Sequence, residues 1–124
     1  MARESFYSID NGYAEPIDID RACRNDPGYY LPFAGNFRYM DLMGTFIYGV
    51  VMKDLNPELS NEKTTSNLMD DKINTGKLGL HIGEGFYTYS KKEMESEEED
   101  FLNFSKKIKA LMDKYPFKDP KEVL

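Results

Sequence analysis

The sequence contains one cysteine, one histidine and no tryptophan among its 124 residues. The single Cys23 excludes an internal disulfide framework and a zinc site built on several thiolates. His81 is the only imidazole, and neither a nucleophile elbow nor an orienting third group stands near it. The sequence therefore predicts no hydrolase triad.

Long apolar runs and basic charge are also scarce. The longest uncharged apolar stretch, residues 42–52, is shorter than the roughly 20 residues that span a bilayer. The first ten residues lack the apolar region of a secretory signal, so a cytoplasmic domain without a membrane segment is expected. Sixteen Lys and Arg stand against 22 Asp and Glu, which gives a net charge of −6. This acidic balance excludes a nucleic-acid surface, because such a surface needs clustered cations.

The sequence is rich in apolar and aromatic residues. Apolar residues make up 40% of the chain, and eight Phe and nine Tyr predict a packed interior. The length favours a single domain. We expect its main part in residues 1–90, with a C-terminal helix and tail of the same domain in residues 91–124.

Breakers and apolar spacing predict an all-α, compact domain of five to six helices. The first helix covers residues 2–10 and lacks a capping signal, so it is expected to be the later part of a longer helix. Pro16 opens the second helix, and residues 29–35 are expected to form an apolar loop. The Asn36 side chain is placed to cap the helix that follows.

The segment after Gly44 is apolar on every face until Lys53. A helix of this kind must be covered all round, by its own domain or by a partner chain. We therefore expect a homodimer whose interface residues are Phe37, Met40, Phe46, Ile47, Val50 and Val51.

The second half of the chain gives two helix starts. Ser66 is expected to cap a helix over residues 67–75. Ser96 and Glu99 have the spacing of a capping box, which predicts the start of the last helix. Apolar residues follow there at helical spacing: Phe101, Phe104, Ile108, Leu111 and Tyr115. Between these helices, the glycines of residues 76–85 predict a closely packed irregular loop.

No catalytic constellation or metal site emerges from the residues alone. The loop Gly79-x-x-x-Gly83-x-Gly85 lacks the Gly-Lys-Ser/Thr end of a phosphate loop, and no dinucleotide fingerprint occurs. The aspartates of residues 18–26 lack the glycine and glutamate of a calcium loop. Cys23 is expected to be a buried, inert thiol.

Four ordered segments nevertheless resemble one family, the C-terminal domain of the 3-hydroxyacyl-CoA dehydrogenases, which includes 3-hydroxybutyryl-CoA dehydrogenases. They contain the sequences IDIDRA (residues 17–22), PF (32–33), MDLMG (40–44) and KLGLHIGEGFYTY (77–89). The family pattern has D-I-D-x-A early and closes on K-x-G followed by G-x-G-F-Y. The resemblance covers residues 3–90, and the ordered set is more specific than any single piece.

The resemblance implies a helical domain similar to the C-terminal domain of 6-phosphogluconate dehydrogenase. Such a domain follows a Rossmann NAD-binding domain, mediates dimerisation and forms one wall of the acyl-CoA site. The catalytic His–Glu pair and NAD site of these enzymes belong to the Rossmann domain, so no catalytic residue, cofactor site or metal site is expected in this chain. The candidates for the substrate wall are Tyr30, Pro32, Phe33 and Asn36. The parent reaction is the NAD-linked interconversion of L-3-hydroxyacyl-CoA and 3-ketoacyl-CoA, in fatty-acid or butanoate metabolism.

The sequence departs from the family pattern at its closing loop. His81 and Ile82 stand where a Lys-Thr pair is usual, and Glu84 stands where a basic residue is common. These changes remove positive charge that would favour contact with a CoA phosphate. Two other interpretations remain: a free-standing helical protein-interaction module without CoA chemistry, and a carboxylate enzyme centred on Asp41.

Overall fold

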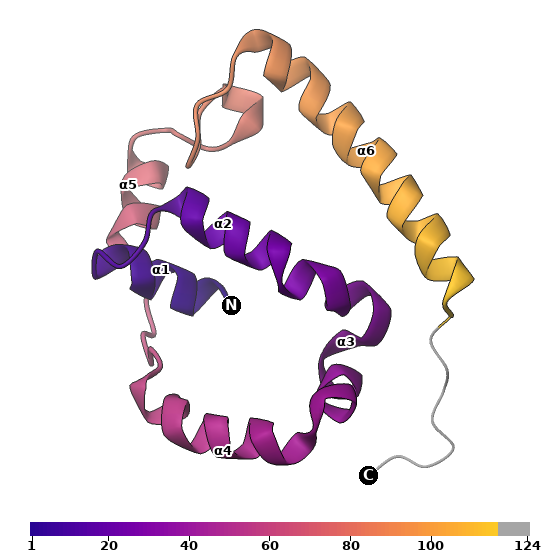
Figure 1. Cartoon of the computed structure of the whole chain (residues 1–124). Coiled ribbons are helices and arrows are strands. Elements are labelled where there is room, and N and C mark those ends of the chain that lie inside the picture. Colours follow the sequence, from indigo (N-terminus) through magenta and orange to yellow (C-terminus); the bar gives the residue numbers. More distant parts are fainter. Residues whose placement is uncertain (117–124) are drawn as a thin grey trace.

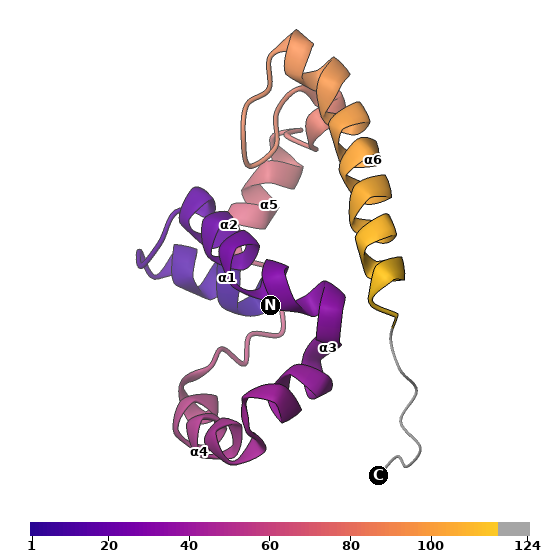
Figure 2. The ribbon, with the colours of Figure 1, turned by 45° about the vertical axis from the view of Figure 1, so that its right-hand side comes forward.

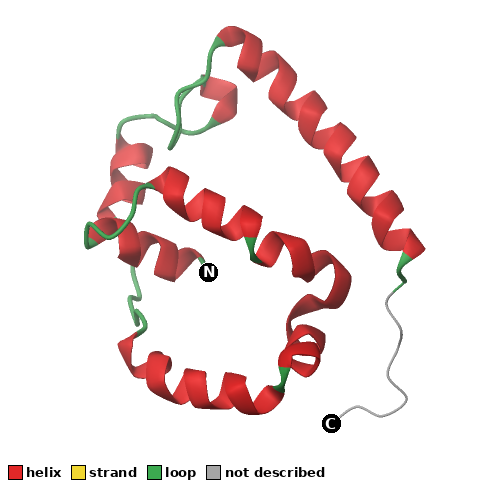
Figure 3. Ribbon diagram, in the orientation of Figure 1, coloured by secondary structure: helices red, strands yellow, loops and turns green. Residues whose placement is uncertain are grey.

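The computed structural model describes residues 1–116, and the described part is all-helical, as predicted. Figure 3 shows helices joined by loops, and within this part of the chain the only β pairing consists of two isolated bridges. In chain order the elements are α1 (Ala2–Asp10), α2 (Pro16–Asn25), α3 (Pro27–Met43), α4 (Thr45–Leu55), the 3-10 turn η1 (Asn56–Glu58), α5 (Asn67–Asn74), the 3-10 turn η2 (Leu80–Ile82) and α6 (Lys91–Lys114). The predicted division at residue 90 stays a prediction, and residues 117–124 of its second part lie outside the described range.

The first two helices form where the sequence predicts them. Gly12 follows α1 with a φ of 73°, a conformation that glycine adopts without steric cost. Pro16 opens α2, and the Glu15 N–H donates to Asp18 Oδ2 at 2.9 Å, which satisfies a free donor at the helix start. α2 packs against both α1 and α3.

The predicted loop at residues 29–35 is wrong, because this segment is the first half of α3. Pro27 suits the first turn of a helix, where its missing N–H costs nothing. The helix breaks at Gly35, whose φ of 67° and ψ of −162° are open to glycine and strained for other residues. Asn36 follows this break and begins the second half of α3, which turns toward α4 (Figure 1).

The start of α6 also differs from the prediction. Its capping box consists of Ser90 and Glu93, with Glu93 N–H to Ser90 Oγ at 3.1 Å and Ser90 N–H to Glu93 Oε2 at 3.3 Å. Ser96 and Glu99 have the same spacing but lie inside the helix, where the Ser96 hydroxyl donates to the Glu93 carbonyl at 3.5 Å. Ser90–Glu93 and Ser96–Glu99 both match the capping pattern. The upstream pair forms the helix cap because the preceding loop ends at residue 89. The predicted cap of α5 is confirmed, since Ser66 Oγ accepts from Leu68 N–H at 3.1 Å.

The helices enclose little interior within one chain. α4 and α6 lie apart from each other in Figures 1 and 2. Ala34 is the only apolar side chain that is buried among the described residues. The packed interior expected from the aromatic content is therefore not formed within residues 1–116, and many large apolar side chains there remain exposed.

Candidate functional site

The loop at residues 77–89 folds back on itself through main-chain hydrogen bonds. Gly79 N–H donates to the Glu84 carbonyl at 2.9 Å, and Tyr89 N–H donates to the Gly83 carbonyl at 2.9 Å. Gly85 is buried, and a Cβ at this position would lie 3.1 Å from the Cα of Gly79. Gly85 thus allows two backbone segments to approach closely, as the packing interpretation of these glycines predicts.

Tyr87 connects this loop to α2. Its hydroxyl donates to Asp20 Oδ2 at 2.5 Å. This hydrogen bond raises the pKa of the Tyr87 hydroxyl to about 12, with a smaller contribution from desolvation. The contact joins the Asp-Ile-Asp segment of α2 to the Gly-Phe-Tyr end of the loop, which are two of the segments that carry the family resemblance.

The charged groups of the loop neutralise one another in part. Lys77 Nζ lies 3.5 Å from Glu84 Oε1, and both side chains are partly exposed. His81 is exposed. A loop whose lysine is already paired with a carboxylate offers weaker attraction to a phosphate group than the basic loop of the family pattern.

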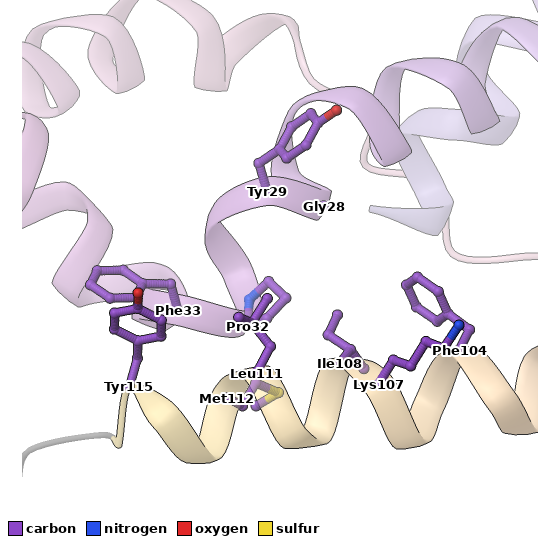
Figure 4. A pocket seen from close by; sticks show the side chains of 10 residues that line it. All are labelled: Gly28, Tyr29, Pro32, Phe33, Phe104, Lys107, Ile108, Leu111, Met112 and Tyr115. Atoms are coloured by element: carbon purple, nitrogen blue, oxygen red, sulfur yellow. The ribbon is translucent and has the colours of Figure 1, made fainter.

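An apolar groove of about 640 Å³ lies between the first half of α3 and the C-terminal half of α6. The groove, which we call the α3–α6 groove, is lined by Gly28, Tyr29, Pro32, Phe33, Phe104, Lys107, Ile108, Leu111, Met112 and Tyr115. Figure 4 shows Tyr29, Pro32 and Phe33 on the α3 side, with the α6 side chains opposite them. At one end the rings of Phe33 and Tyr115 meet edge to face, with centroids 6.2 Å apart. Lys107 is the only charged residue among these lining residues.

The four residues predicted for the substrate wall do not form one surface. Pro32 and Phe33 line the α3–α6 groove, whereas Tyr30 stacks on Tyr39 with ring centroids 3.6 Å apart. Desolvation, followed by the charge of Asp26, raises the pKa of Tyr30. Asn36 is exposed beyond the break at Gly35. Helix formation over residues 27–35 separates them, because successive residues of a helix point in different directions.

The residues predicted for a dimer interface are mostly exposed and lie on the second half of α3 and on α4. Phe37 and Phe46 are each 80% exposed, and Ile47, Val50 and Val51 are also exposed, whereas Met40 is partly buried. The exposed apolar residues of α4 and of the second half of α3 are together called the α4 face: Phe37, Leu42, Met43, Phe46, Ile47, Val50, Val51, Met52 and Leu55. Dimerisation itself stays a prediction.

Sequence reasoning missed the role of α6 as a groove wall. The sequence predicts one apolar face on this helix, because four apolar residues recur at helical spacing: Phe104, Ile108, Leu111 and Tyr115. Only the tertiary structure shows that this face lines the α3–α6 groove.

The remaining single residues have ordinary surroundings. Cys23 is partly exposed rather than buried, with its Sγ 4.0 Å from the Sδ of Met1, so the expectation of a buried thiol is wrong. Asp41 lines a cleft of about 590 Å³ together with Arg38 and Lys114, and is therefore not an isolated acid. Within residues 1–116 no group of His, Cys, Asp and Glu is arranged to hold a metal ion. No helix in that range is both long and apolar enough to span a bilayer.

Comparison with known proteins supports the family resemblance. The sequence profile of the family "3-hydroxyacyl-CoA dehydrogenase, C-terminal domain" matches residues 1–89. A curated relative, the 5-formyl-3-hydroxy-2-methylpyridine 4-carboxylate 5-dehydrogenase of Mesorhizobium japonicum, is 29% identical over 90 residues, which are 73% of this chain and 29% of that protein.

A solved structure gives the same fold. The crystal structure of a 5-formyl-3-hydroxy-2-methylpyridine 4-carboxylic acid 5-dehydrogenase, described as an NAD⁺-dependent dismutase, superposes with a TM-score of 0.83 and 23% sequence identity. The superposition covers 90% of this chain and 36% of that one. The chain thus spans about a third of the length of the proteins that it matches.

Proposed function

Because the chain belongs to the 3-hydroxyacyl-CoA dehydrogenase C-terminal domain family, we propose that it is the helical half of an NAD-dependent dehydrogenase. The observation that carries this proposal is the family match over residues 1–89. The Asp20–Tyr87 hydrogen bond supports it, because it joins two of the matching segments in space. The other half is a Rossmann domain, in the same polypeptide or in a separate one, and we expect the enzyme in the cytoplasm.

The described residues do not fit an NAD site. A dinucleotide site presents a glycine-rich turn to the pyrophosphate at a helix start. Here Gly85 is buried against Gly79, and the residues that follow it form no helix until Ser90 caps α6. NAD and the catalytic base are therefore assigned to the Rossmann half, and this chain alone is expected to be inactive.

For the substrate, we propose an L-3-hydroxyacyl-CoA, which is oxidised to the 3-ketoacyl-CoA or formed in the reverse reaction. In this assignment Pro32 and Phe33 supply an apolar wall for the acyl chain, whereas Tyr30 and Asn36 lie outside the groove that these two residues line. The partly hydrophobic surface of α3 supports the proposal, because transfer of an apolar acyl chain from water to an apolar surface is favourable.

A pyridine aldehyde is a second candidate substrate. The curated relative acts, by its name, on a formyl-hydroxy-methylpyridine carboxylate. The Lys77–Glu84 pair supports this candidate, because it weakens the case for a CoA phosphate at the closing loop.

The experiment begins with the DNA around the coding region, which is searched for a Rossmann-encoding segment in frame or in a neighbouring gene. The complete enzyme, or the two halves together, is then assayed by NADH absorbance with acetoacetyl-CoA and with the pyridine aldehyde. We expect turnover with one substrate and none with this chain alone. NADH oxidation by the pure chain would contradict the assignment of the catalytic residues to the Rossmann half. No turnover in any combination would favour the interpretation as a protein-interaction module.

The exposed α4 face supports a dimeric form of this enzyme. Phe37 and Phe46 are large apolar side chains with four-fifths of their surface in water. Soluble monomers rarely leave many large apolar side chains of neighbouring helices exposed to water. We therefore propose that the chain supplies the dimerisation surface of the dehydrogenase.

A further inference from the structure

The α3–α6 groove is bridged at one end and carries its charge at the other. Phe33 and Tyr115 bring the two walls together at one end, where their ring centroids lie 6.2 Å apart. Figure 4 shows Lys107 beside Phe104 at the opposite end. Lys107 is the only charged residue among those that line the groove. The groove therefore combines an apolar interior with one cation at its Phe104 end.

The Lys107 ammonium group is available to an anionic ligand. Within residues 1–116 the ion pairs of lysine are Lys77 with Glu84 and Lys109 with Asp113, and neither of them engages Lys107. Lysine side chains often lay their methylene groups on an apolar surface and keep the ammonium group in water. An anion that enters this end of the groove thus meets a cation without having to displace a carboxylate.

The walls of the groove favour a hydrocarbon chain. Phe33, Phe104 and Leu111 each expose more than half of their surface to water. A chain that lies against these residues removes apolar surface from water on both sides of the contact, which is favourable.

The α6 wall is long enough for a chain of medium length. From Lys107 to Tyr115 the helix rises about 12 Å, at about 1.5 Å per residue. With carbon–carbon bonds of about 1.5 Å, an extended chain of roughly ten carbons has this length. The groove volume of about 640 Å³ also falls within the range of roughly 300–1,000 Å³ that is usual for small-molecule sites.

The α6 wall is not part of the family pattern. The family match ends at residue 89, and α6 begins at Lys91. The opposite wall contains Pro32 and Phe33, which the proposed function assigns to the acyl chain of the substrate. A ligand that fills the groove would therefore compete with that acyl chain.

We propose that the α3–α6 groove binds a free medium-chain carboxylate, whose head group pairs with Lys107 and whose chain runs along Ile108 and Leu111 toward Phe33. Its regulatory consequence rests on the proposed function: the bound carboxylate takes the place of the acyl chain and inhibits the dehydrogenase. The binding itself is a property of this chain and is measured on it directly.

The first test follows the methionine methyl groups of the full chain by NMR during titration with decanoate. Met112 lines the groove, whereas Met94 lies beside Gly83 near the start of α6. We expect the Met112 signal to shift and the Met94 signal to stay. Across hexanoate, octanoate and decanoate the affinity should rise roughly two- to fourfold per methylene, fourfold corresponding to complete burial at about 0.8 kcal/mol each. Chains longer than the groove should gain no further affinity.

The second test separates the charge of Lys107 from the apolar contact. Lys107→Gln should weaken octanoate binding by about threefold, as expected for the loss of a partly exposed ion pair. The same variant should leave the binding of octanol, which has no charge, unchanged. Lys106→Gln is the matched control, because Lys106 is not among the residues that line the groove. Circular dichroism of both variants checks that α6 is still helical.

Each other outcome overturns the proposal. Shifts of Met43 and Met52 without a shift of Met112 would show adsorption on the α4 face. Equal weakening of octanoate and octanol by Lys107→Gln would show that the lysine acts on the shape of the groove. No shift at millimolar decanoate would show that the groove is not open to a chain, and a dimer mass by light scattering would then identify a second copy as its cover.

The regulatory consequence has its own test. In the complete enzyme, decanoate should raise the KM for the acyl substrate and leave kcat unchanged, and Lys107→Gln should reduce this inhibition by about threefold. Binding to the chain without inhibition would overturn the competition with the acyl chain. Failure of the proposed function appears separately, as the absence of NADH turnover without any decanoate.

Discussion

Tyr87 and Asp20 lie 67 positions apart in the sequence and are joined by a hydrogen bond of 2.5 Å from the tyrosine hydroxyl to Oδ2. The contact holds the glycine-rich loop against α2. Its effect on the pKa of Tyr87 makes the contact measurable.

We predict that this hydrogen bond makes folding stability depend on alkaline pH. The pKa of Tyr87 is about 12 in the folded state and near 10.0 without its partner. Between these values the unfolded chain loses a proton that the folded chain keeps, so the free energy of unfolding falls as pH rises from about 10 to about 12. Below pH 10 the stabilisation is fully present.

The measurement is urea unfolding at several pH values for the wild type and for Tyr87→Phe. The variant should be less stable at pH 8 and should lose less stability above pH 10 than the wild type does. Tyr13→Phe is the control, since that side chain is 75% exposed. An unchanged pH profile in Tyr87→Phe would show that the hydrogen bond is absent in solution.

The helix cap of α6 gives a second prediction. Ser90→Ala removes the hydroxyl that accepts from Glu93 N–H and should cost about 1 kcal/mol of stability. Ser96→Ala removes a hydroxyl inside the helix and should change stability by less than about 0.5 kcal/mol. Urea midpoints followed by circular dichroism distinguish the two, and a larger loss in Ser96→Ala would restore the downstream helix start.

Two glycines predict opposite effects of the same substitution. Gly85→Ala places a Cβ 3.1 Å from the Cα of Gly79 and should destabilise by about 1–3 kcal/mol through overpacking. Gly49→Ala, inside α4, meets no atom within 4 Å and should stabilise the helix by roughly 0.5–1 kcal/mol. Thermal unfolding of both variants tests this pair. Equal unfolding midpoints for the two variants would mean that the loop at residues 77–89 can relax around the methyl group added at Gly85.

The α4 face gives a fourth prediction. Val50→Asp should lower the mass measured by light scattering from about twice 14.4 kDa to that of one chain, because the carboxylate would be buried without a partner. Lys53→Glu changes charge at the polar end of α4 and should leave the mass nearly unchanged. A Val50→Asp chain that keeps the wild-type mass would place the dimer contact elsewhere.

The sequence predicted local structure best where one signal was sufficient. The all-α class, the limits of α1, the start of α2 at Pro16 and the Ser66 cap of α5 follow from apolar spacing, Pro16 and a hydroxyl at the right position. The α6 start was misplaced because Ser90 and Ser96 carry the same capping pattern, and only the end of the preceding loop decides between them. The prediction of a loop at residues 29–35 was wrong because Pro32 indicated a break there. In the structure this segment is helical, begins at Pro27 and breaks at Gly35.

By itself, the sequence determined the helical class, the family segments and the presence of a charge-free apolar helix, since these depend on neighbouring residues. The tertiary structure decided which distant groups meet: Tyr87 with Asp20, Lys77 with Glu84, and Phe33 with Tyr115. It also decided that the apolar side of α6 faces a groove. Helical spacing predicts that a face is apolar, but the path of the connecting loops determines what that face lies against.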